Sequence, residues 1–150
     1  MNVAIGADHA GFDLKERVKS YLEARGHHVL DMGTHSTEST DYPGYAFHVA
    51  EAVREGKAER GVLVCDSGNG IAIAANKVEG IRAALCLNRK MGELARRHND
   101  ANVLVLGSAF IPPEEVEPTI DAWLTSPFDG GRHARRIGQI TEYERSHQHQ

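Results

Sequence analysis

The stretch VLVCDSGNGIAIAANK, residues 62–77, decides how this chain folds. Residues 62–65 are apolar and predict a short buried strand. A turn containing Gly68 and Gly70 follows, and the apolar run over residues 71–75 predicts the start of a helix. A strand that passes through a glycine-bearing turn into a helix directs backbone N–H groups and the positive helix end at one place. Such a place suits an anion, for example a phosphate or an enolate.

Cys65 is the last residue of this predicted strand, at the edge of the turn. Catalytic groups of open α/β sheets gather at the carboxyl ends of strands, which makes Cys65 a candidate for chemistry. A cysteine in this position is nevertheless more often a small buried hydrophobe, and a Gly-x-Gly turn is often only a turn. The polar residues elsewhere in the chain are needed to decide between these interpretations.

The composition indicates one soluble globular domain spanning residues 1–150. Apolar residues make up 41% of the 150 residues and charged residues 25%, which is ordinary for such a domain. The net charge of −4 provides no basic surface, so we expect no nucleic-acid partner. Two cysteines do not form a disulfide framework and fit a reducing cytoplasm. We see no signal-peptide pattern and no apolar run of about 18 residues, and expect no membrane association.

Short apolar strands and amphipathic helices alternate about five times along the chain. The predicted strands cover residues 3–5, 28–31, 61–65, 82–87 and 103–106. The predicted helices cover about residues 12–24, a segment from 43, a segment from 71, residues 90–97, a segment from 112, and residues 132–145. This alternation predicts a five-stranded parallel sheet between two helical layers, a three-layer α/β/α sandwich.

The last predicted helix has no strand after it. Such an additional C-terminal helix either packs on a partner subunit or caps its own sheet. The polar residues 144–150 that follow predict a frayed tail, whose two histidines we do not count as a metal site.

Polar residues follow four of the five predicted strands. They are Asp8 and His9 after the first, Asp41 and Tyr42 after the loop that follows the second, Cys65 to Gly70 after the third, and Ser108 with Ala109 after the fifth. Because parallel strands end at the same edge of a sheet, these residues predict one site there.

Two further groups do not follow a strand. His98 and Asn99 end a helix, which normally places them at the opposite edge, and they reach the site only if they belong to a neighbouring subunit. A helix-terminal cap is the commoner role for such a histidine. Arg132 and Arg136 are four residues apart on one helical face, where they either grip one phosphate or form a solvated basic surface.

Six motifs occur in order along residues 3–143. They are Gly6-x-Asp8-His9-Ala10-Gly11-Phe12, Asp41-Tyr42-Pro43, Ser67-Gly68-Asn69-Gly70, Ile73-Ala74-Ala75-Asn76-Lys77, Arg97-His98-Asn99-Asp100 and Gly131-Arg132-His133-x-x-Arg136. Together they resemble the ribose-5-phosphate isomerase B family and the related galactose-6-phosphate isomerase subunits. Each motif is modest alone, but six in this order are highly specific.

The resemblance implies a cytoplasmic aldose–ketose isomerase of carbohydrate metabolism with a Rossmann-like fold and no cofactor or metal. Its implied substrate is a small sugar phosphate, with ribose 5-phosphate and ribulose 5-phosphate of the pentose phosphate pathway as the leading pair. It also implies a homodimer, or a higher oligomer, whose active sites are shared between chains.

The resemblance also assigns roles to individual residues. Cys65 matches the base that moves a proton between C1 and C2, and Ile71 stands where other members carry a glutamate, so the chain resembles the cysteine branch. His98 matches the residue that opens the furanose ring, with Asp8 nearby in proton handling. The anion hole that holds the enediolate matches Asp66, Ser67, Gly68, Asn69 and Gly70, and Ser67 is also counted among the catalytic residues. The phosphate grip matches His9, Arg132 and Arg136. Further substrate contacts match Tyr42 and Asn99.

Two departures from the family pattern leave the substrate open. Ala109 stands where many relatives have an arginine, and Asp66 stands where the cysteine branch often has glycine. A carboxylate beside Cys65 disfavours the thiolate unless it points away. The alternatives are a six-carbon substrate such as allose or galactose 6-phosphate, and a non-catalytic sugar-phosphate-binding module. A thiol redox role is weaker, since there is no Cys-x-x-Cys motif.

Overall fold

Five parallel strands form the central sheet of the computed structural model, which describes residues 1–147. They are Asn2–Ala7 (β1), His28–Asp31 (β2), Arg60–Cys65 (β3), Ala83–Leu85 (β4) and Val103–Gly107 (β5). They lie in the order β2-β1-β3-β5-β4, and every neighbouring pair is parallel. The alternation of strand and helix patterns therefore predicts the sheet correctly.

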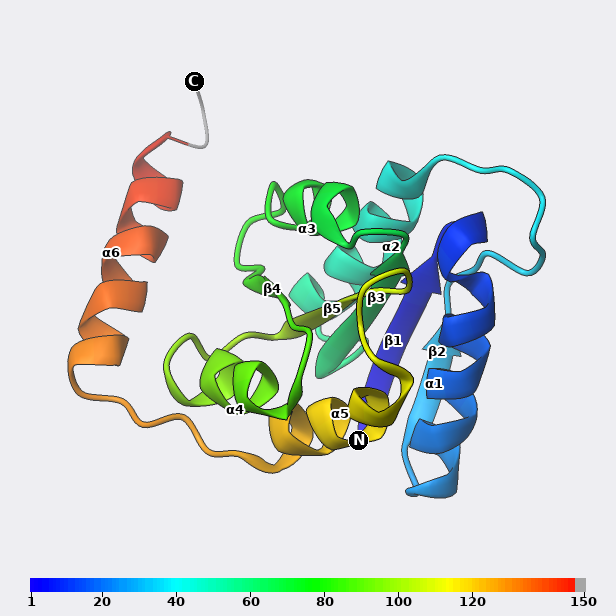
Figure 1. Ribbon diagram of the computed structural model, residues 1–150. Helices are drawn as coiled ribbons and strands as arrows, with labels where there is room; N and C mark the ends of the chain where they lie inside the picture. The colour runs from blue at the N-terminus through cyan, green and yellow to red at the C-terminus, as the bar shows by residue number, and fades with distance from the viewer. Residues whose placement is uncertain (148–150) are drawn as a thin grey trace.

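Helices connect the strands and cover both faces of the sheet (Figure 1). The α-helices are Phe12–Ala24 (α1), Tyr42–Arg54 (α2), Asn69–Ala75 (α3), Arg89–Arg97 (α4), Val116–Thr125 (α5) and Arg132–His147 (α6), with short 3-10 turns at His9–Gly11 (η1) and Pro113–Glu115 (η2). Helices α1, α4 and α5 contribute to one core cluster, and α2 and α3 to the other. The predicted three-layer α/β/α sandwich is confirmed.

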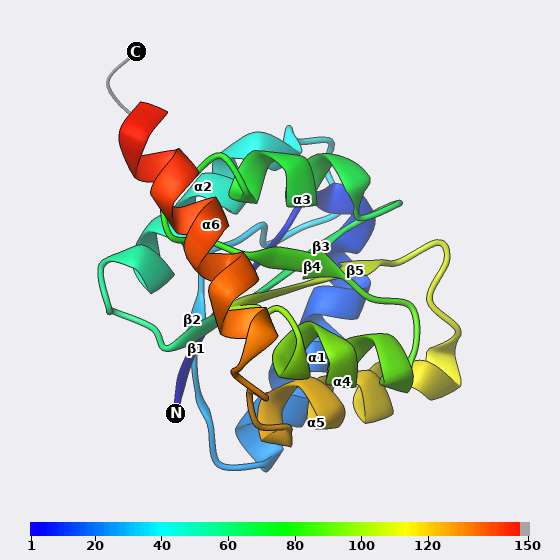
Figure 2. The same cartoon turned by 90° about the vertical axis from the view of Figure 1, so that its left-hand side faces the viewer.

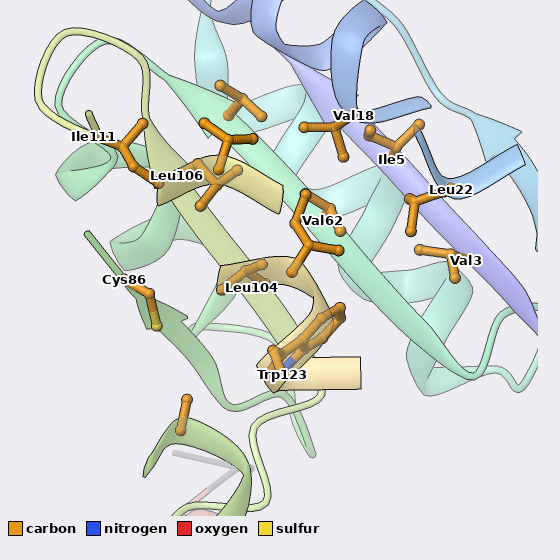
Figure 3. Close-up of a cluster of buried hydrophobic side chains, with 14 of the residues drawn as sticks. Val3, Ile5, Val18, Leu22, Val62, Cys86, Leu104, Leu106, Ile111 and Trp123 are labelled. Carbon is orange, nitrogen blue, oxygen red and sulfur yellow. The ribbon is translucent and has the colours of Figure 1, made fainter. Parts of the chain in front are cut away.

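Alternation along the strands sends neighbouring residues into different cores. On β1, Val3 and Ile5 face the layer of α1 and α5, whereas Ala4 between them faces α2. Figure 3 shows the first of these cores, in which Trp123 of α5 lies under the sheet. The Trp123 indole N–H donates to the carbonyl of Ala101 over 2.9 Å, so its one polar group is satisfied while its ring is fully buried.

Several predicted boundaries shift in the structure. β4 keeps only three of the six predicted residues because it is an edge strand that pairs with β5 alone, through Ala83–Leu85. Cys86 therefore follows the strand rather than lying in its middle, yet it remains 1% exposed. Helix α3 begins at Asn69, before the predicted start at residue 71. The helix predicted from residue 112 opens with η2, and α5 proper begins at Val116.

Helix α6 lies at the periphery of the fold, where few side chains join it to the rest of the chain, among them Glu144, which accepts from the N–H of Gly80 over 2.9 Å. Figures 1 and 2 show it beyond the β4 edge of the sheet, and none of its residues is buried. A cavity of about 660 Å³, lined by Phe128 and Ile137 among others, lies along it. Since α6 buries no side chain of its own, it does not cap its sheet as a packed layer would. Packing on a partner subunit is the alternative that stays open.

Helix α6 also changes the expected tail. It runs to His147, so residues 144–147 of the predicted frayed tail are helical. Residues 148–150 lie outside the part of the chain that the structure describes. Within residues 1–147, no helix is long and apolar enough to cross a membrane.

Candidate active site

The turn that joins β3 to α3 holds the thiol of Cys65 in place. Cys65 is the last residue of β3, where it pairs with Gly107 of β5, and it is 5% exposed. The backbone N–H of Gly68 donates to its Sγ over 3.2 Å. This contact fixes the sulfur against the backbone of the turn.

Two positions in this turn require glycine because a larger residue would clash with its neighbours. Gly68 has φ +83°, and a Cβ atom there would lie 2.5 Å from Cδ1 of Leu85. A Cβ atom on Gly70 would lie 2.5 Å from Cζ of Tyr42, so the Tyr42 ring rests directly on the turn. The turn is further braced by Ser67, whose Oγ accepts from the N–H of Asn69 over 3.2 Å. Since first-turn amides of a helix lack intrahelical partners, α3 offers donors to an anion at this point.

Asp8 and His9 lie at the same edge, after β1. The Asp8 carboxylate is 7% exposed and accepts from the N–H of Gly11 over 3.1 Å. A Cβ atom on Gly11 would lie 2.5 Å from the carbonyl oxygen of Val64, so η1 rests on the end of β3. Nδ1 of His9 lies 3.1 Å from the backbone nitrogen of Thr40, which ties the loop before α2 to this edge.

The loop after β5 is pinned to the same turn. The N–H of Ser108 donates to the carbonyl of Cys65 over 2.9 Å, and the N–H of Ala109 donates to the carbonyl of Asp66 over 3.0 Å. The side chain of Asp66 is exposed. The polar residues predicted to follow β1, β3 and β5 thus come together at the carboxyl edge of the sheet, joined by Tyr42 at the start of α2.

His98 and Asn99 lie at the opposite edge. His98 is the C-cap of α4, and the chain then reaches Asn102, whose carbonyl accepts from the N–H of Gly61 at the start of β3. Four residue steps of strand separate Gly61 from Cys65, a span of about 13 Å. One chain therefore does not bring His98 to Cys65, as the position of His98 at the end of a helix predicts.

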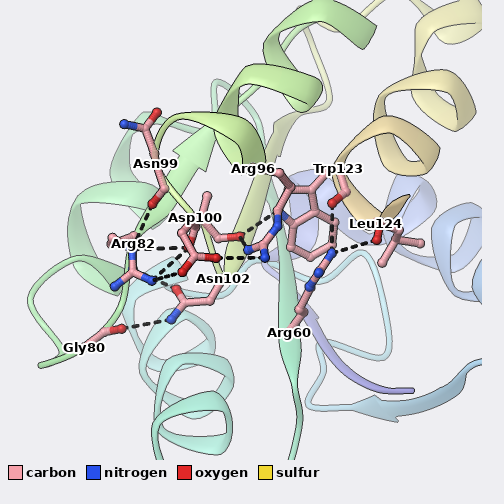
Figure 4. A network of polar contacts seen from close by, with 10 residues as sticks. Arg60, Gly80, Arg82, Arg96, Asn99, Asp100, Asn102, Trp123 and Leu124 are labelled. Atoms are coloured by element: carbon pink, nitrogen blue, oxygen red, sulfur yellow. Dashed lines mark hydrogen bonds and ion pairs between the residues drawn. The ribbon is translucent and has the colours of Figure 1, made fainter. Parts of the chain in front are cut away.

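A network of arginines fixes the segment that carries His98 and Asn99 (Figure 4). The guanidinium of Arg82 donates to the carbonyls of Asn99 and Asp100, each over 2.9 Å. Arg96 donates to the carbonyl of Ala101 over 2.7 Å and pairs with the Asp100 carboxylate at 2.8 Å. Asp100 itself has φ +46°, an uncommon conformation for a residue with a side chain, which these contacts support.

The first turn of α6 belongs to this second group. Arg132 and Arg136 are exposed and lie one helical turn apart. Between them, the ring of His133 stacks on that of His98, with centroids 4.2 Å apart and planes 9° apart. Just before the helix, the Asp129 carboxylate pairs with Arg97 of α4 at 3.0 Å. The structure therefore gathers His98, Asn99, Arg132 and Arg136 at one end of the molecule.

Sequence reasoning assigned no role to His133 or Asp129. His133 stands inside the motif that contains both arginines, but a histidine beside an arginine carries no signal of its own. Its contact with His98 depends on how the linker at residues 126–131 returns α6 to the end of α4, and no local pattern encodes that path. Loss of solvent contact and the positive groups His98, Arg132 and Arg136 lower the pKa of His133, while Asp129 acts in the opposite direction.

His98, Asp129 and His133 also offer three potential metal ligands, whose ligand atoms lie within 4.8 Å of one another. Their arrangement fits a metal poorly. Lone pairs of imidazole nitrogens lie in the ring plane, and these two planes are nearly parallel, so the nitrogens do not converge on one point. Asp129 is already paired with Arg97, and further positive side chains lie on the same turn of α6.

The two cysteines have different environments. Burial raises the pKa of the Cys86 thiol to about 12, so Cys86 stays neutral at ordinary pH. Its Sγ points at the carbonyl of Ala84, 3.7 Å away, inside the core. Cys65 instead lies at the strand end with an amide donor on its sulfur. Of the two cysteines, Cys65 is therefore the one that lies among the polar residues at the carboxyl edge of the sheet.

The parallel α/β/α sheet and the polar groups at its carboxyl edge define a Rossmann-like α/β protein, of the class that binds ligands where strands end. The model of the Ribose/Galactose Isomerase family matches residues 3–140, and the chain belongs to that family. This confirms the family that the six motifs resemble.

Individual relatives agree with this membership. Ribose-5-phosphate isomerase B of Escherichia coli strain K12 is 47% identical over 142 residues, which cover 95% of each chain. D-erythrulose-4-phosphate isomerase of Pectobacterium atrosepticum is 42% identical over 151 residues, covering 100% of this chain and 99% of the relative. The solved structure of ribose-5-phosphate isomerase B from Mycoplasma genitalium, with bound ribulose-5-phosphate, has a TM-score of 0.92 at 40% identity and covers 96% of each chain.

Proposed function

We propose that this protein is an aldose–ketose isomerase that interconverts ribose 5-phosphate and ribulose 5-phosphate through an enediolate. The observation that carries the proposal is the hydrogen bond from Gly68 to the sulfur of Cys65, within a turn that opens a helix. Isomerisation removes a carbon-bound proton beside a carbonyl and needs both a base and a stabiliser for the oxyanion that forms. Membership in an isomerase family supports the same chemistry.

The roles follow the order of the reaction. His98 donates a proton to the ring oxygen as the sugar opens, and Asp8 handles the hydroxyl protons. The Cys65 thiolate then takes the proton from C2, leaving an enediolate whose oxygens accept hydrogen bonds from the turn at residues 66–70. Cys65 returns the proton to C1 and the ketose results. No redox partner is needed, because the proton and electron pair only move between neighbouring carbons.

The phosphate serves as a handle far from the reacting carbons. In this proposal His9, Arg132 and Arg136 hold it, with Tyr42 and Asn99 contacting the rest of the sugar. Charge-assisted hydrogen bonds from arginine suit a phosphate dianion. Remote binding energy of this kind positions the reacting carbons over the base.

We further propose that each active site combines two chains of a homodimer. The candidates divide into a carboxyl-edge group around Cys65 and a group around His98 at the opposite edge, and the strand between these edges spans about 13 Å from Gly61 to Cys65. Helix α6, which buries no side chain in its own subunit, can bring the distant group to a partner. In a two-fold dimer both sites are then equivalent. We place this enzyme in the cytoplasm, in the pentose phosphate pathway.

The length of the sugar is the main alternative. Ala109 provides no cation where an arginine would extend the phosphate grip, and a relative 42% identical over the whole chain is named for a four-carbon sugar phosphate. A six-carbon substrate such as allose or galactose 6-phosphate, or binding without catalysis, would also use the same turn.

A turnover screen over sugar phosphates of four, five and six carbons tests the proposal. We expect the highest kcat/KM with ribose 5-phosphate. A higher value with a four- or six-carbon substrate would reassign the substrate within the same chemistry. Saturable binding of all these compounds without turnover would contradict the isomerase and support a binding module.

A further inference from the structure

The ring of His133 supports the ring of His98 from one face. The two imidazoles stack at 4.2 Å with planes 9° apart. His98 is half-buried at the end of α4, where a histidine side chain has several rotamers available, and a flat ring against one face restricts the plane that it can adopt.

A second contact strengthens this arrangement. Asp129, three residues before α6, pairs with the guanidinium of Arg97 at 3.0 Å, and its N–H donates to the carbonyl of Arg97 over 3.0 Å. The end of α4 and the linker before α6 are thus joined at Arg97, the residue directly before His98. Two glycines of the linker, Gly130 and Gly131, have φ of +70° and +56°, which lets the chain turn sharply from Asp129 into the helix.

His133 lies between the two arginines that the proposed function assigns to the phosphate. Arg132 and His133 are the first residues of α6, and Arg136 follows one turn later. A phosphate held by these arginines therefore acts on the turn of helix that also supports the ring of His98. One rigid element would then link the anchoring of the phosphate to the orientation of the ring-opening group.

We infer that His133 is a positioning residue for His98, holding the imidazole plane of His98 in line with the ring oxygen of a sugar whose phosphate is bound on the same turn of α6. This inference rests on the proposed function. The charged groups around the stack are Arg97 from α4, Asp129 from the linker, and Arg132 and Arg136 from α6. They leave His133 with a lowered pKa, so at neutral pH it stacks as an uncharged ring.

Three variants of the full-length protein test the inference. His133→Ala removes the ring, and His133→Phe keeps a flat ring without its nitrogens. Arg135→Ala is the matched control, because Arg135 is an exposed side chain on the same turn with no role in the proposed site.

The kinetic readout separates ring opening from proton transfer. Ribose 5-phosphate is mostly a closed furanose, whereas ribulose 5-phosphate cannot close to one because its C5 oxygen carries the phosphate. With ribose 5-phosphate, His133→Ala should lower kcat by roughly 10- to 100-fold with KM within a few-fold. Solvent-deuterium exchange into ribulose 5-phosphate should stay near the parent rate. His133→Phe should recover most of the aldose rate, and Arg135→Ala should match the parent.

Parental aldose turnover in His133→Ala, or an equal loss of aldose turnover and ketose exchange, would overturn the inference. Failure of His133→Phe to recover the aldose rate would also overturn it. A second readout needs no substrate: the His98 ring protons should show an aromatic ring-current shift in NMR spectra of the parent and His133→Phe, and lose it in His133→Ala. If the parent neither isomerises nor exchanges, the proposed function fails, and these shifts still decide whether His133 fixes His98.

Discussion

The backbone N–H of Gly68 donates a hydrogen bond to Sγ of Cys65 across 3.2 Å, within the turn that leads from β3 into α3. The sulfur of the proposed base thus lies beside the backbone amides that would stabilise the negative charge of the enediolate. The strand places the sulfur and the turn places its donor, so both come from one local segment of sequence.

Removing the thiol should stop the chemistry and keep the binding. Cys65→Ala should lose isomerisation and solvent-deuterium exchange at C2, because it removes the base that is proposed to take the carbon-bound proton. Its affinity for the sugar phosphate, measured by calorimetry, should stay within a few-fold. Cys86→Ala is the control and should keep the parental rate within a few-fold. Exchange at a near-normal rate in Cys65→Ala would contradict the assignment of Cys65 as the base.

The backbone conformation of the turn at Gly68 should contribute to the stability of the fold. Gly68→Ala places a Cβ atom in a left-handed backbone conformation and 2.5 Å from Leu85. The conformation alone costs about 1–2 kcal/mol, and displacing Leu85 adds to it. Gly26→Ala is a matched control, since Gly26 has φ +85° with open space around it. Denaturant unfolding should show a larger loss for Gly68→Ala. Equal losses of unfolding free energy in the two variants would contradict the prediction, because they would mean that Leu85 moves aside without cost.

Among the arginines of α6, only Arg132 and Arg136 should contribute to the phosphate grip. Arg132→Ala and Arg136→Ala should each raise KM for the sugar phosphate by a factor equivalent to roughly 1.5–3 kcal/mol, the value of a charge-assisted hydrogen bond. Arg135→Ala removes the same charge from the same turn and should leave KM near the parent value. If all three variants bind inorganic phosphate and substrate like the parent, the arginines form only a solvated basic surface.

Asp31 should govern the acid stability of the fold. Burial alone would raise the pKa of its carboxyl, but hydrogen bonds from Lys15, Gly33 and Lys19 outweigh that effect and lower it. The distances from Lys15 Nζ are 2.8 and 2.9 Å, and that lysine is fully buried. Because the unfolded chain holds the proton more tightly, the stabilisation is complete above the unfolded pKa and disappears as pH falls through the folded one.

The corresponding variant is Asp31→Asn. At neutral pH it should lower the free energy of unfolding by about 3 kcal/mol, because a buried lysine loses its main partner. The difference from the parent should shrink as the pH falls below about 3.8. Glu38→Gln, on an exposed loop, should change neither value. A gap between Asp31→Asn and the parent that stays constant down to pH 2 would contradict this role.

The sequence predicts the fold well because its evidence is local. Apolar runs such as residues 62–65 and the amphipathic helices between them determine the layers without reference to distant contacts. The predicted ends of strands are less accurate where pairing with a neighbouring strand decides them. β4 is shorter than its apolar run because an edge strand has one partner. The sequence predicts an end of α6 that is too early, because its polar residues carry little periodic signal, and residues 144–147 are helical where the sequence predicts a tail.

The candidate site also divides into residues that local sequence patterns place and contacts that depend on distant parts of the chain. Residues that follow strands, such as Asp8 and Cys65, could be placed together from the topology alone. His98 could be placed at the opposite edge for the same reason. The stack of His133 on His98 could not be predicted, because it depends on the path of the linker at residues 126–131. The roles of all these residues remain predictions that kinetics must test.

The mixed dimer of two inactive variants tests the central claim most directly, namely that one site uses Cys65 of one chain and His98 of the other. Cys65→Ala and His98→Ala homodimers should each be nearly inactive on cyclic ribose 5-phosphate. When the two variants are refolded together and mixed dimers are confirmed by native mass spectrometry, one site carries both lesions and the other carries neither. Activity should then return towards one intact site per mixed dimer. Mixed dimers that remain as inactive as the parent variants would contradict the shared site.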